Sequence, residues 1–329
     1  MIYLDNKLTI GIPTYNRKDA LIRLLKSIEC QNYNLLYEII ICDNASPYDV
    51  ETVIKDSVSP AFFSKCRIIK NGFNIGGPAN IKNQFLFCKS KWFWLIGDDD
   101  EITDEAIYVI LKDIEADPNC AYFKYSTRIG AGVLKEADIR IDSLHEFINY
   151  SHNRYPGNLV FMSNNIYNIE KLAPYFHIMM TYNTSVPQCV PMMVGLDLGE
   201  IYVRFSSKVI CVYNMPDGGV AWNMLRVALA LSCIQEIPFK SLRNKEWNGL
   251  LSAFRLMPFR LVVGWCVRNK EKVGHYRLIK RAYDGMYDSP FHFFDYILLQ
   301  LCKLEFLYNI PLLSKIYSIK KCHYVEKKN

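Results

Sequence analysis

The sequence predicts an α/β fold in which a mostly parallel sheet is flanked by helices and followed by a helical C-terminal region. Over residues 1–125, short β-branched or aromatic runs alternate with segments whose apolar residues recur at helical spacing. The apolar residues within each run are continuous, as in strands covered on both faces, so βαβ units and a mostly parallel sheet are expected. After the turn at Asp217-Gly218-Gly219, the periodic segments indicate helices.

The expected elements follow one another in regular order. Apolar runs predict strands at 8–12, 38–42, 66–70, 92–96 and 121–126. Helical spacing predicts helices at 19–28, about 78–88 and 103–115, with a shorter segment at 49–58. Ser143-Leu144-His145-Glu146 has the capping-box pattern that starts a helix. Residues 156–213 mix loops with strand-like pieces at 159–162, 201–205 and 209–213.

Charge is distributed unevenly along the chain. The net charge is +6, but residues 1–239 carry 22 Lys or Arg against 26 Asp or Glu, whereas residues 240–329 carry 17 against 7. The tail therefore has a net charge of +10 and is where a basic contact surface is expected. No nucleic-acid-binding signature accompanies it, so a nucleic-acid partner is not expected. An anionic membrane face attracts the same kind of surface.

The sequence shows neither a membrane span nor an export signal. No run approaches the roughly 18 to 20 uncharged apolar residues that a span needs, which argues against channels, transporters and processive membrane synthases. The first seven residues lack the basic and apolar regions of a signal peptide. The 11 cysteines are scattered without a CxxC pair, as is typical of buried free thiols. A cytoplasmic location is expected.

Polar loops follow four of the predicted strands at their carboxyl ends. These loops are 13–17, 43–46, 71–77 and 97–100. In an open parallel sheet, ligands bind beyond the carboxyl ends of the strands, so the four loops are expected to meet on one rim.

The last of these loops carries three adjacent carboxylates, Asp98-Asp99-Asp100. Burying unpaired like charges is very costly, so the run is not a core feature. One interpretation is a solvated loop that favours the start of the following helix. The other is a Mg²⁺ or Mn²⁺ site, because these ions prefer carboxylate oxygens and bridge them to substrate phosphates.

Two further loops are candidates for ligand contact. The turn Asn74-Ile75-Gly76-Gly77 can bring backbone close to a phosphate or sugar, although it matches neither a dinucleotide loop nor a P-loop. Asp43 can accept hydrogen bonds from a base or a ribose, or can simply make a turn.

Four segments, taken together and in this order, resemble family 2 glycosyltransferases of the GT-A fold, which has a Rossmann-like sheet. They are 8–17 (LTIGIPTYNR), 38–46 (EIIICDNAS), 71–80 (NGFNIGGPAN) and 94–100 (WLIGDDD). The resemblance covers about 7–125, thins over 126–215 and is absent from the tail. The expected organisation is a GT-A domain at 1–215, with a donor half at about 1–125 and an acceptor half at about 126–215, followed by a helical basic region at 216–329.

The resemblance also implies roles for particular residues. Pro13, Thr14 and Tyr15, with Asn16 beside them, match the segment that lies against the nucleobase of a nucleotide-sugar donor. Asp43 matches the carboxylate that holds the base or ribose, and Asn74, Gly76 and Gly77 are expected to approach the donor. The acidic run matches the motif that binds Mn²⁺ or Mg²⁺, with Asp99 as metal ligand, Asp98 toward the ribose or diphosphate, and Asp100 as an alternative ligand.

The chain departs from the family pattern where the catalytic base belongs. Inverting members present an acidic pair ahead of a helix that ends in Gly before a strand, and Gly199 matches that glycine. Counting back 11 residues places Gln188 at the carboxylate position, and glutamine cannot act as a general base. Either Asp197 or another carboxylate serves instead, or the proton leaves through His177 or Asp217.

The expected activity is transfer of a sugar from a nucleotide-diphosphate-sugar donor, a UDP-sugar being favoured, to an acceptor hydroxyl, with inversion implied by the family. The expected acceptor is a saccharide or a lipid-linked saccharide in bacterial surface-polysaccharide synthesis, such as O-antigen or capsule. The tail at 240–329 either contacts the inner face of the cytoplasmic membrane or is a helical subdomain with a solvated basic face.

Two other classes of protein remain open. A sugar-phosphate nucleotidyltransferase has a related sheet and an acidic metal site, but a Gly-rich loop with Arg and Lys is expected after its first strand, where this chain has Pro13-Thr14-Tyr15-Asn16. A non-catalytic nucleotide-sugar or polysaccharide-binding module is the other, and Gln188 favours it. A processive synthase is disfavoured because the chain lacks a QxxRW motif.

Overall fold

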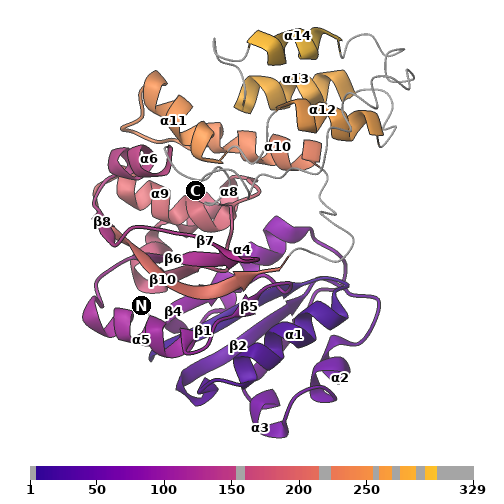
Figure 1. The fold of residues 1–329 in the computed structure, drawn as a ribbon, viewed down its shortest axis with the longest axis vertical. Helices are drawn as coiled ribbons and strands as arrows, with labels where there is room; N and C mark the ends of the chain where they lie inside the picture. Colours follow the sequence, from indigo (N-terminus) through magenta and orange to yellow (C-terminus); the bar gives the residue numbers. More distant parts are fainter. Residues whose placement is uncertain are drawn as a thin grey trace.

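A ten-stranded sheet lies at the centre of the structure, a computed structural model that describes residues 5–152, 160–214, 224–254, 259–268, 275–286 and 293–301 (Figure 1). The strand order is β3-β2-β1-β4-β9-β6-β10-β5, with β7 paired to β6 and β8 paired to β10. The first four strands are β1 (Asp5–Thr14), β2 (Leu36–Asp43), β3 (Cys66–Lys70) and β4 (Ser90–Leu95), and all pair in parallel. The helices among them are α1 (Lys18–Glu29), α2 (Val50–Lys55), α3 (Pro60–Phe63) and α4 (Gly77–Phe87).

The second half of the sheet mixes strand directions. Its strands are β5 (Glu101–Ile102), β6 (Tyr122–Ile129), β7 (Gly132–Leu134), β8 (Ile139–Ile141), β9 (Asn165–Asn168) and β10 (Val203–Tyr213). The long strands β6 and β10 pair in parallel, whereas the short strand β9 lies antiparallel between β4 and β6. The helices are α5 (Ala106–Ala116), α6 (Leu144–His152), α7 (Ile169–Leu172), α8 (Phe176–Thr181) and α9 (Val190–Asp197).

Both faces of the sheet are covered by helices, as the continuous apolar runs predict. In β4, Trp92 and Trp94 pack on the side of α1 and α5, while Phe93 and Leu95 pack with α4, α6 and α9 on the other side. Successive side chains of a strand point to opposite faces, so a strand that is apolar throughout requires this double cover. All nine cysteines in the described residues are free thiols.

Two of the strand-like pieces predicted after residue 156 differ from the structure. The pieces at 201–205 and 209–213 form one strand, β10, because the polar stretch at 206–208 stays beside β6 through a register irregularity rather than leaving the sheet. The piece at 159–162 is not a strand where it is described, because the Asn165 N–H turns back onto the carbonyl of Met162 and β9 begins only there.

The C-terminal region is helical, as predicted. Its described helices are α10 (Met224–Ser232), α11 (Asn244–Phe254), α12 (Phe259–Arg268), α13 (His275–Met286) and α14 (Phe293–Leu301). Helices α10 and α11 lie against α6, α8 and α9 (Figure 1). Among the residues described, no helix combines the length and the apolar character needed to cross a bilayer.

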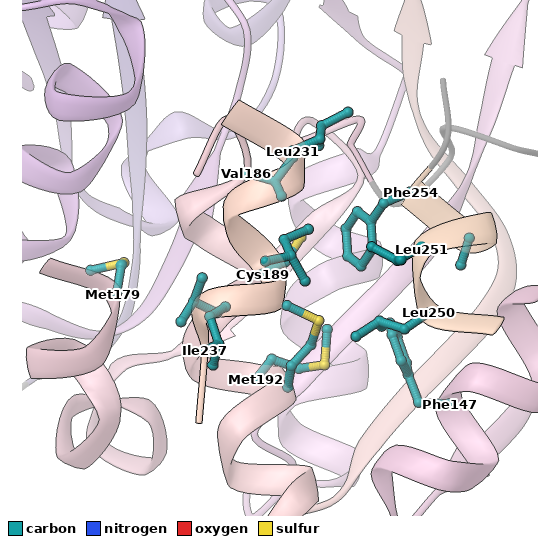
Figure 2. Close-up of a cluster of buried hydrophobic side chains, with 14 of the residues drawn as sticks. Phe147, Met179, Val186, Cys189, Met192, Leu231, Ile237, Leu250, Leu251 and Phe254 are labelled. Carbon is teal, nitrogen blue, oxygen red and sulfur yellow. The ribbon is translucent and has the colours of Figure 1, made fainter. Parts of the chain in front are cut away.

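A continuous apolar cluster joins this helical region to the helices on the sheet (Figure 2). Side chains of α6 and α9, such as Phe147 and Met192, meet Leu231, Leu250 and Phe254 of α10 and α11. Residues 190–196 of α9 are all buried, because the sheet side and the C-terminal helices cover this helix from opposite directions. A helix that is apolar all round is the form expected for such a central position.

Candidate active site

The carboxyl ends of the first strands meet at one rim, as the sequence predicts. Thr14, the last residue of β1, is paired with Asp43, the last residue of β2, and Asp43 is paired with Lys70 at the end of β3. The ladder continues into the loops, because the Asn44 N–H donates to the carbonyl of Thr14 at 2.9 Å and the Asn71 N–H to that of Asp43 at 2.9 Å. The loops that follow these strands are therefore held side by side.

The loop after β4 joins this rim through Asp98. The hydroxyl of Thr14 donates to Oδ2 of Asp98 at 2.7 Å, and Asp98 is only 4% exposed. Burial raises the pKa of Asp98 to about 6, although Arg17 and the hydrogen bond from Thr14 act in the opposite direction. The contact fixes the acidic run directly beside the predicted nucleobase segment.

Arg17 neutralises two of the three carboxylates. Its Nη1 atom donates to Oδ1 of Asp98 at 2.9 Å and to Oδ2 of Asp99 at 2.7 Å. Burial works to lower the pKa of Arg17, but Asp98 and Asp99 raise it overall. Asn16, whose φ of 53° is tolerated by asparagine, turns the chain so that Arg17 caps the start of α1.

Asp100 is held on separate partners. Its Oδ2 accepts from the hydroxyl of Ser163 at 2.5 Å and its Oδ1 from the N–H of Asn214 at 3.3 Å. Burial raises the pKa of Asp100 to about 8. A Cβ on Gly97 would lie 3.1 Å from Oδ1 of Asp99 and 3.2 Å from Oδ2 of Asp100, so glycine lets both carboxylates fold back over this position.

Asp99 is the member of the run that is open to a ligand. Its side chain is 19% exposed, and its Oδ1 atom has no hydrogen-bond partner among the described residues. Within the described ranges no group of three or more His, Cys, Asp or Glu side chains is arranged to hold a metal ion. Mg²⁺, however, is commonly held by one or two carboxylates together with substrate phosphates, and Asp99 beside Asp98 fits that mode.

The loop with Asn74, Gly76 and Gly77 is held by a network of amide side chains. Asn44 donates to Oδ1 of Asn74 at 2.8 Å and accepts from the Ile75 N–H at 2.9 Å, while Asn74 also accepts from the Gly76 N–H at 2.9 Å. Gly76 has a φ of +86°, which favours glycine, and a Cβ on Gly76 or Gly77 would meet no atom within 4 Å. The backbone of this loop is therefore open to an approaching group.

Asp43 is fully buried at the centre of the rim. Its Oδ1 atom accepts from the Ser46 N–H at 2.8 Å, so one oxygen makes a turn, while its Oδ2 atom has no partner. A buried acceptor without a partner costs free energy unless a ligand or water satisfies it. Tyr15, 46% exposed beside Thr14, presents an aromatic ring at the rim, and Pro13 is paired with Cys42 within the sheet.

The candidates for the catalytic base come from separate segments, and their role stays a prediction. Gln188 is buried in the 3-10 turn just before α9, where its Nε2 atom donates to the carbonyl of Val160 at 3.5 Å and its Oε1 atom has no partner. Asp197 lies at the other end of α9 and accepts from the N–H groups of Lys240 and Ser241 at 2.6 Å and 3.0 Å.

The remaining two candidates are His177 and Asp217, of which the structure describes His177. The exposed ring of His177 contacts the carbonyl of Pro174 through Nδ1 at 2.9 Å. Asp217 lies outside the described residues. In the described structure neither Asp197 nor His177 hydrogen-bonds to the acidic run or to the loops of the rim.

Several residues of the rim carry no prediction from the sequence. Arg17 and Asn44 directly follow predicted site residues, so their positions in the sequence could have indicated that they belong to the rim. Ser163 and Asn214 come from distant segments and have no signal of their own, because only the sheet order brings β9 and the end of β10 next to the acidic run.

Comparison with known proteins decides the family. Residues 9–179, just over half of the chain, match the sequence model of Glycosyl transferase family 2. The chain belongs to glycosyl transferase family 2. The matched segment contains the Thr14–Asp98 contact, Asp43 and the whole acidic run, so these parts of the rim lie within the family match.

Relatives and solved structures agree with this assignment. Abequosyltransferase RfbV of Salmonella typhimurium is 33% identical over 100 residues, which is 30% of this chain and 30% of that protein. Staphylococcus aureus TarS 1–349 in complex with UDP-GlcNAc superimposes with a TM-score of 0.57 at 13% identity, covering 84% of this chain and 79% of TarS. Mannosyltransferase PcManGT from Pyrobaculum calidifontis, in complex with GDP-Man and Mn²⁺, gives 0.51 at 13% identity, covering 96% and 85%. The fold of this family 2 member is GT-A, as predicted.

Proposed function

We propose that the protein transfers a sugar from a UDP-sugar donor to a hydroxyl of a saccharide acceptor, with a divalent metal ion and with inversion. The observation that carries the proposal is the hydrogen bond from Thr14 to Asp98, because it joins the segment proposed to border the nucleobase to the acidic run. The proposed donor half is about 1–125 and the acceptor half about 126–215, with 216–329 as a helical basic region.

The proposed donor site follows the rim from the base to the diphosphate. Pro13, Thr14, Tyr15 and Asn16 border the nucleobase, and the partnerless Oδ2 of Asp43 accepts from the base or ribose. The open backbone of Asn74, Gly76 and Gly77 approaches the donor from the opposite loop. A helix start preceded by glycines is suited to an anionic group, because its N–H groups are unpaired.

Asp99, with Asp98 beside it and Asp100 as the alternative, is the proposed ligand of Mn²⁺ or Mg²⁺. When bound, such an ion neutralises charge that develops on the departing diphosphate. The acceptor oxygen forms the new bond to the anomeric carbon while the bond from that carbon to the diphosphate breaks. The acceptor's proton passes to a group other than Gln188, because an amide is not a base at neutral pH.

The proposed acceptor is a lipid-linked saccharide of a surface-polysaccharide pathway such as O-antigen or capsule, reached at the inner face of the cytoplasmic membrane. Two observations support this: the partial similarity to an abequosyltransferase and the net charge of +10 over 240–329.

The proposed membrane contact lies in this basic region. There Leu278, Tyr296 and Ile297 are exposed on α13 and α14, and Arg277 is exposed beside Leu278. Flotation with phosphatidylglycerol vesicles tests the contact, and equal binding to phosphatidylcholine vesicles would contradict it.

Thermal stabilisation by nucleotides is the first test of the donor site. UDP with Mn²⁺ is expected to raise the melting temperature more than UDP with EDTA, since a ligand at 100 times its Kd adds about 2.7 kcal/mol to the stability. Asp99→Asn should lose the Mn²⁺-dependent part, whereas Asp104→Asn, an exposed carboxylate on the following turn, should keep it. The same UDP effect with and without Mn²⁺ in the wild type would contradict the metal site.

Turnover separates the two rival classes. A glycosyltransferase releases UDP from a UDP-sugar in proportion to acceptor glycosylated, in a metal-dependent manner. A nucleotidyltransferase would instead exchange pyrophosphate with a sugar phosphate, and a binding module would release no UDP beyond the rate of spontaneous hydrolysis.

A further inference from the structure

One guanidinium nitrogen spans two carboxylates of the acidic run. Nη1 of Arg17 lies 2.9 Å from Oδ1 of Asp98 and 2.7 Å from Oδ2 of Asp99. No other Lys or Arg in the described part of the chain is within ion-pair distance of these two side chains. Arg23 is nearby, but its contacts are to Glu101 at 3.3 Å and to the backbone carbonyl of Asp99 at 3.5 Å.

The position of Arg17 suits an exchangeable partner better than a structural clamp. Its backbone is fixed, because its carbonyl accepts from the Leu21 N–H in the first turn of α1 at 3.0 Å. Its side chain is 33% exposed, so solvent reaches part of the guanidinium while it contacts the carboxylates. The guanidinium can therefore leave the carboxylates without disturbing the helix that carries it.

The negative charges of Asp98 and Asp99 require a positive partner. Asp98 and Asp99 are adjacent, and their side chains are only 6% and 19% exposed. Two carboxylates this close are stable in their charged forms only beside a positive charge, because water screens them poorly at this burial. A divalent ion bound at Asp99 would supply the same charge and would compete with Arg17 for Oδ2.

We propose that Arg17 is a resident counter-ion that holds the acidic run in the free enzyme and makes metal binding depend on the donor. This inference rests on the proposed function. With Arg17 in place, a metal ion alone binds weakly, because it must displace the guanidinium. When UDP arrives with the metal, Arg17 exchanges a carboxylate for a diphosphate oxygen, a partner that suits its fork-shaped donor group. Metal and nucleotide thus bind cooperatively.

The test is the binding of Mn²⁺ without nucleotide, followed by electron paramagnetic resonance of free Mn²⁺. Arg17→Gln is expected to bind Mn²⁺ about tenfold more tightly than the wild type, a coupling of ordinary size. Arg23→Gln, which removes a neighbouring charge without touching the two carboxylates, should stay close to the wild-type affinity. Unchanged or weaker Mn²⁺ binding by Arg17→Gln overturns the proposal.

Two further readouts keep the test decisive. UDP should tighten Mn²⁺ binding strongly in the wild type and about tenfold less in Arg17→Gln; equal tightening in both overturns the proposal. If Arg17→Gln does not fold, Arg17→Lys replaces it, because the shorter ammonium group reaches one carboxylate rather than two and Mn²⁺ affinity should still rise. A wild type that binds no Mn²⁺ even with UDP would refute the proposed metal site. The counter-ion role is tested separately, by comparing Mn²⁺ binding of the wild type and Arg17→Gln without nucleotide.

Discussion

The hydroxyl of Thr14 donates a 2.7 Å hydrogen bond to Oδ2 of Asp98, and this bond joins residues that lie 84 positions apart in the chain. Both residues are buried, and each follows or ends a strand at the carboxyl edge of the sheet. Because β1 and β4 are neighbours, the end of one strand can orient the acidic loop that follows the other. The bond therefore ties the end of β1 to the acidic loop within the proposed donor site.

Removing this hydroxyl should weaken donor binding. We expect Thr14→Val to raise the Kd of UDP in the presence of Mn²⁺ about tenfold, because a hydrogen bond to a charged group contributes roughly 1.5 to 3 kcal/mol. Thr14→Ser, which keeps the hydroxyl, should bind within about threefold of the wild type. Isothermal titration calorimetry measures both, and a Thr14→Val variant with wild-type affinity would contradict the role given to the bond.

The amide network should determine the order of the loop at 74–77. Asn44→Ala removes the partner of Asn74 and of the Ile75 N–H, so amide exchange at Ile75 and Gly76 should accelerate and the Kd of UDP should rise about tenfold. Asn83→Ala, a half-buried asparagine on α4 without these contacts, should change neither quantity. Hydrogen exchange with mass spectrometry checks the loop, and unaltered exchange in Asn44→Ala would refute the prediction.

Gln84 should be replaceable with a gain in stability. It is fully buried on α4, and neither atom of its amide has a hydrogen-bond partner. Gln84→Met keeps the volume and removes the unsatisfied groups, so the free energy of unfolding in urea should rise by about 1 kcal/mol. Asn80→Leu on the same helix should lower it, because Asn80 bonds to the carbonyl of Cys42 at 2.9 Å. A less stable Gln84→Met protein would show that this amide is satisfied in solution.

Asp117 should make the stability of the fold depend on pH. Burial works to raise the pKa of Asp117, but hydrogen bonds from Tyr202 and Arg204 lower it overall. A lowered folded-state pKa stabilises the protein above the ordinary value of about 3.9, and this contribution is lost as the pH falls through the lower value. Asp117→Asn should therefore lower the free energy of unfolding by roughly 1 kcal/mol at pH 7, a value kept small because solvent screens the partly exposed Arg204. The difference in stability between the variant and the wild type should narrow below about pH 4.

Urea unfolding at several pH values measures this dependence. Asp56→Asn, an exposed carboxylate at the end of α2, serves as the control and should follow the wild type across the range. A constant gap between Asp117→Asn and the wild type from pH 3 to pH 7 would be inconsistent with the ion pair.

Local patterns were sufficient to predict the first half of the fold. The runs at 38–42 and 92–96 are apolar on both faces, and the structure covers both faces with helices. The second half was harder to read, because β9 has only four residues and enters the sheet between β4 and β6, far from its neighbours in sequence. Periodicity carries no information about such long-range pairing.

The rim was predictable for the same reason, since ligand loops follow parallel strands. The positions of Thr14 and the acidic run after neighbouring strands predict that they lie together, and the structure joins them. The contacts of Asp100 were not predictable, because Ser163 and Asn214 reach it through the strand order alone. The role of Asp197 stays a prediction, and its contacts to the loop at 240–241 were not predictable because they join segments far apart in the sequence.

The apolar cluster shared by α9 and the C-terminal helices limits how this chain can be engineered. A protein truncated after residue 214 would leave Phe147 and Met192 without the partners that cover them. It would therefore expose an apolar surface that favours aggregation. A chimera carrying another transferase's tail would place unmatched side chains against the same surface. Exchanging acceptor preference by swapping tails therefore requires that the facing residues of α6 and α9 be exchanged with them.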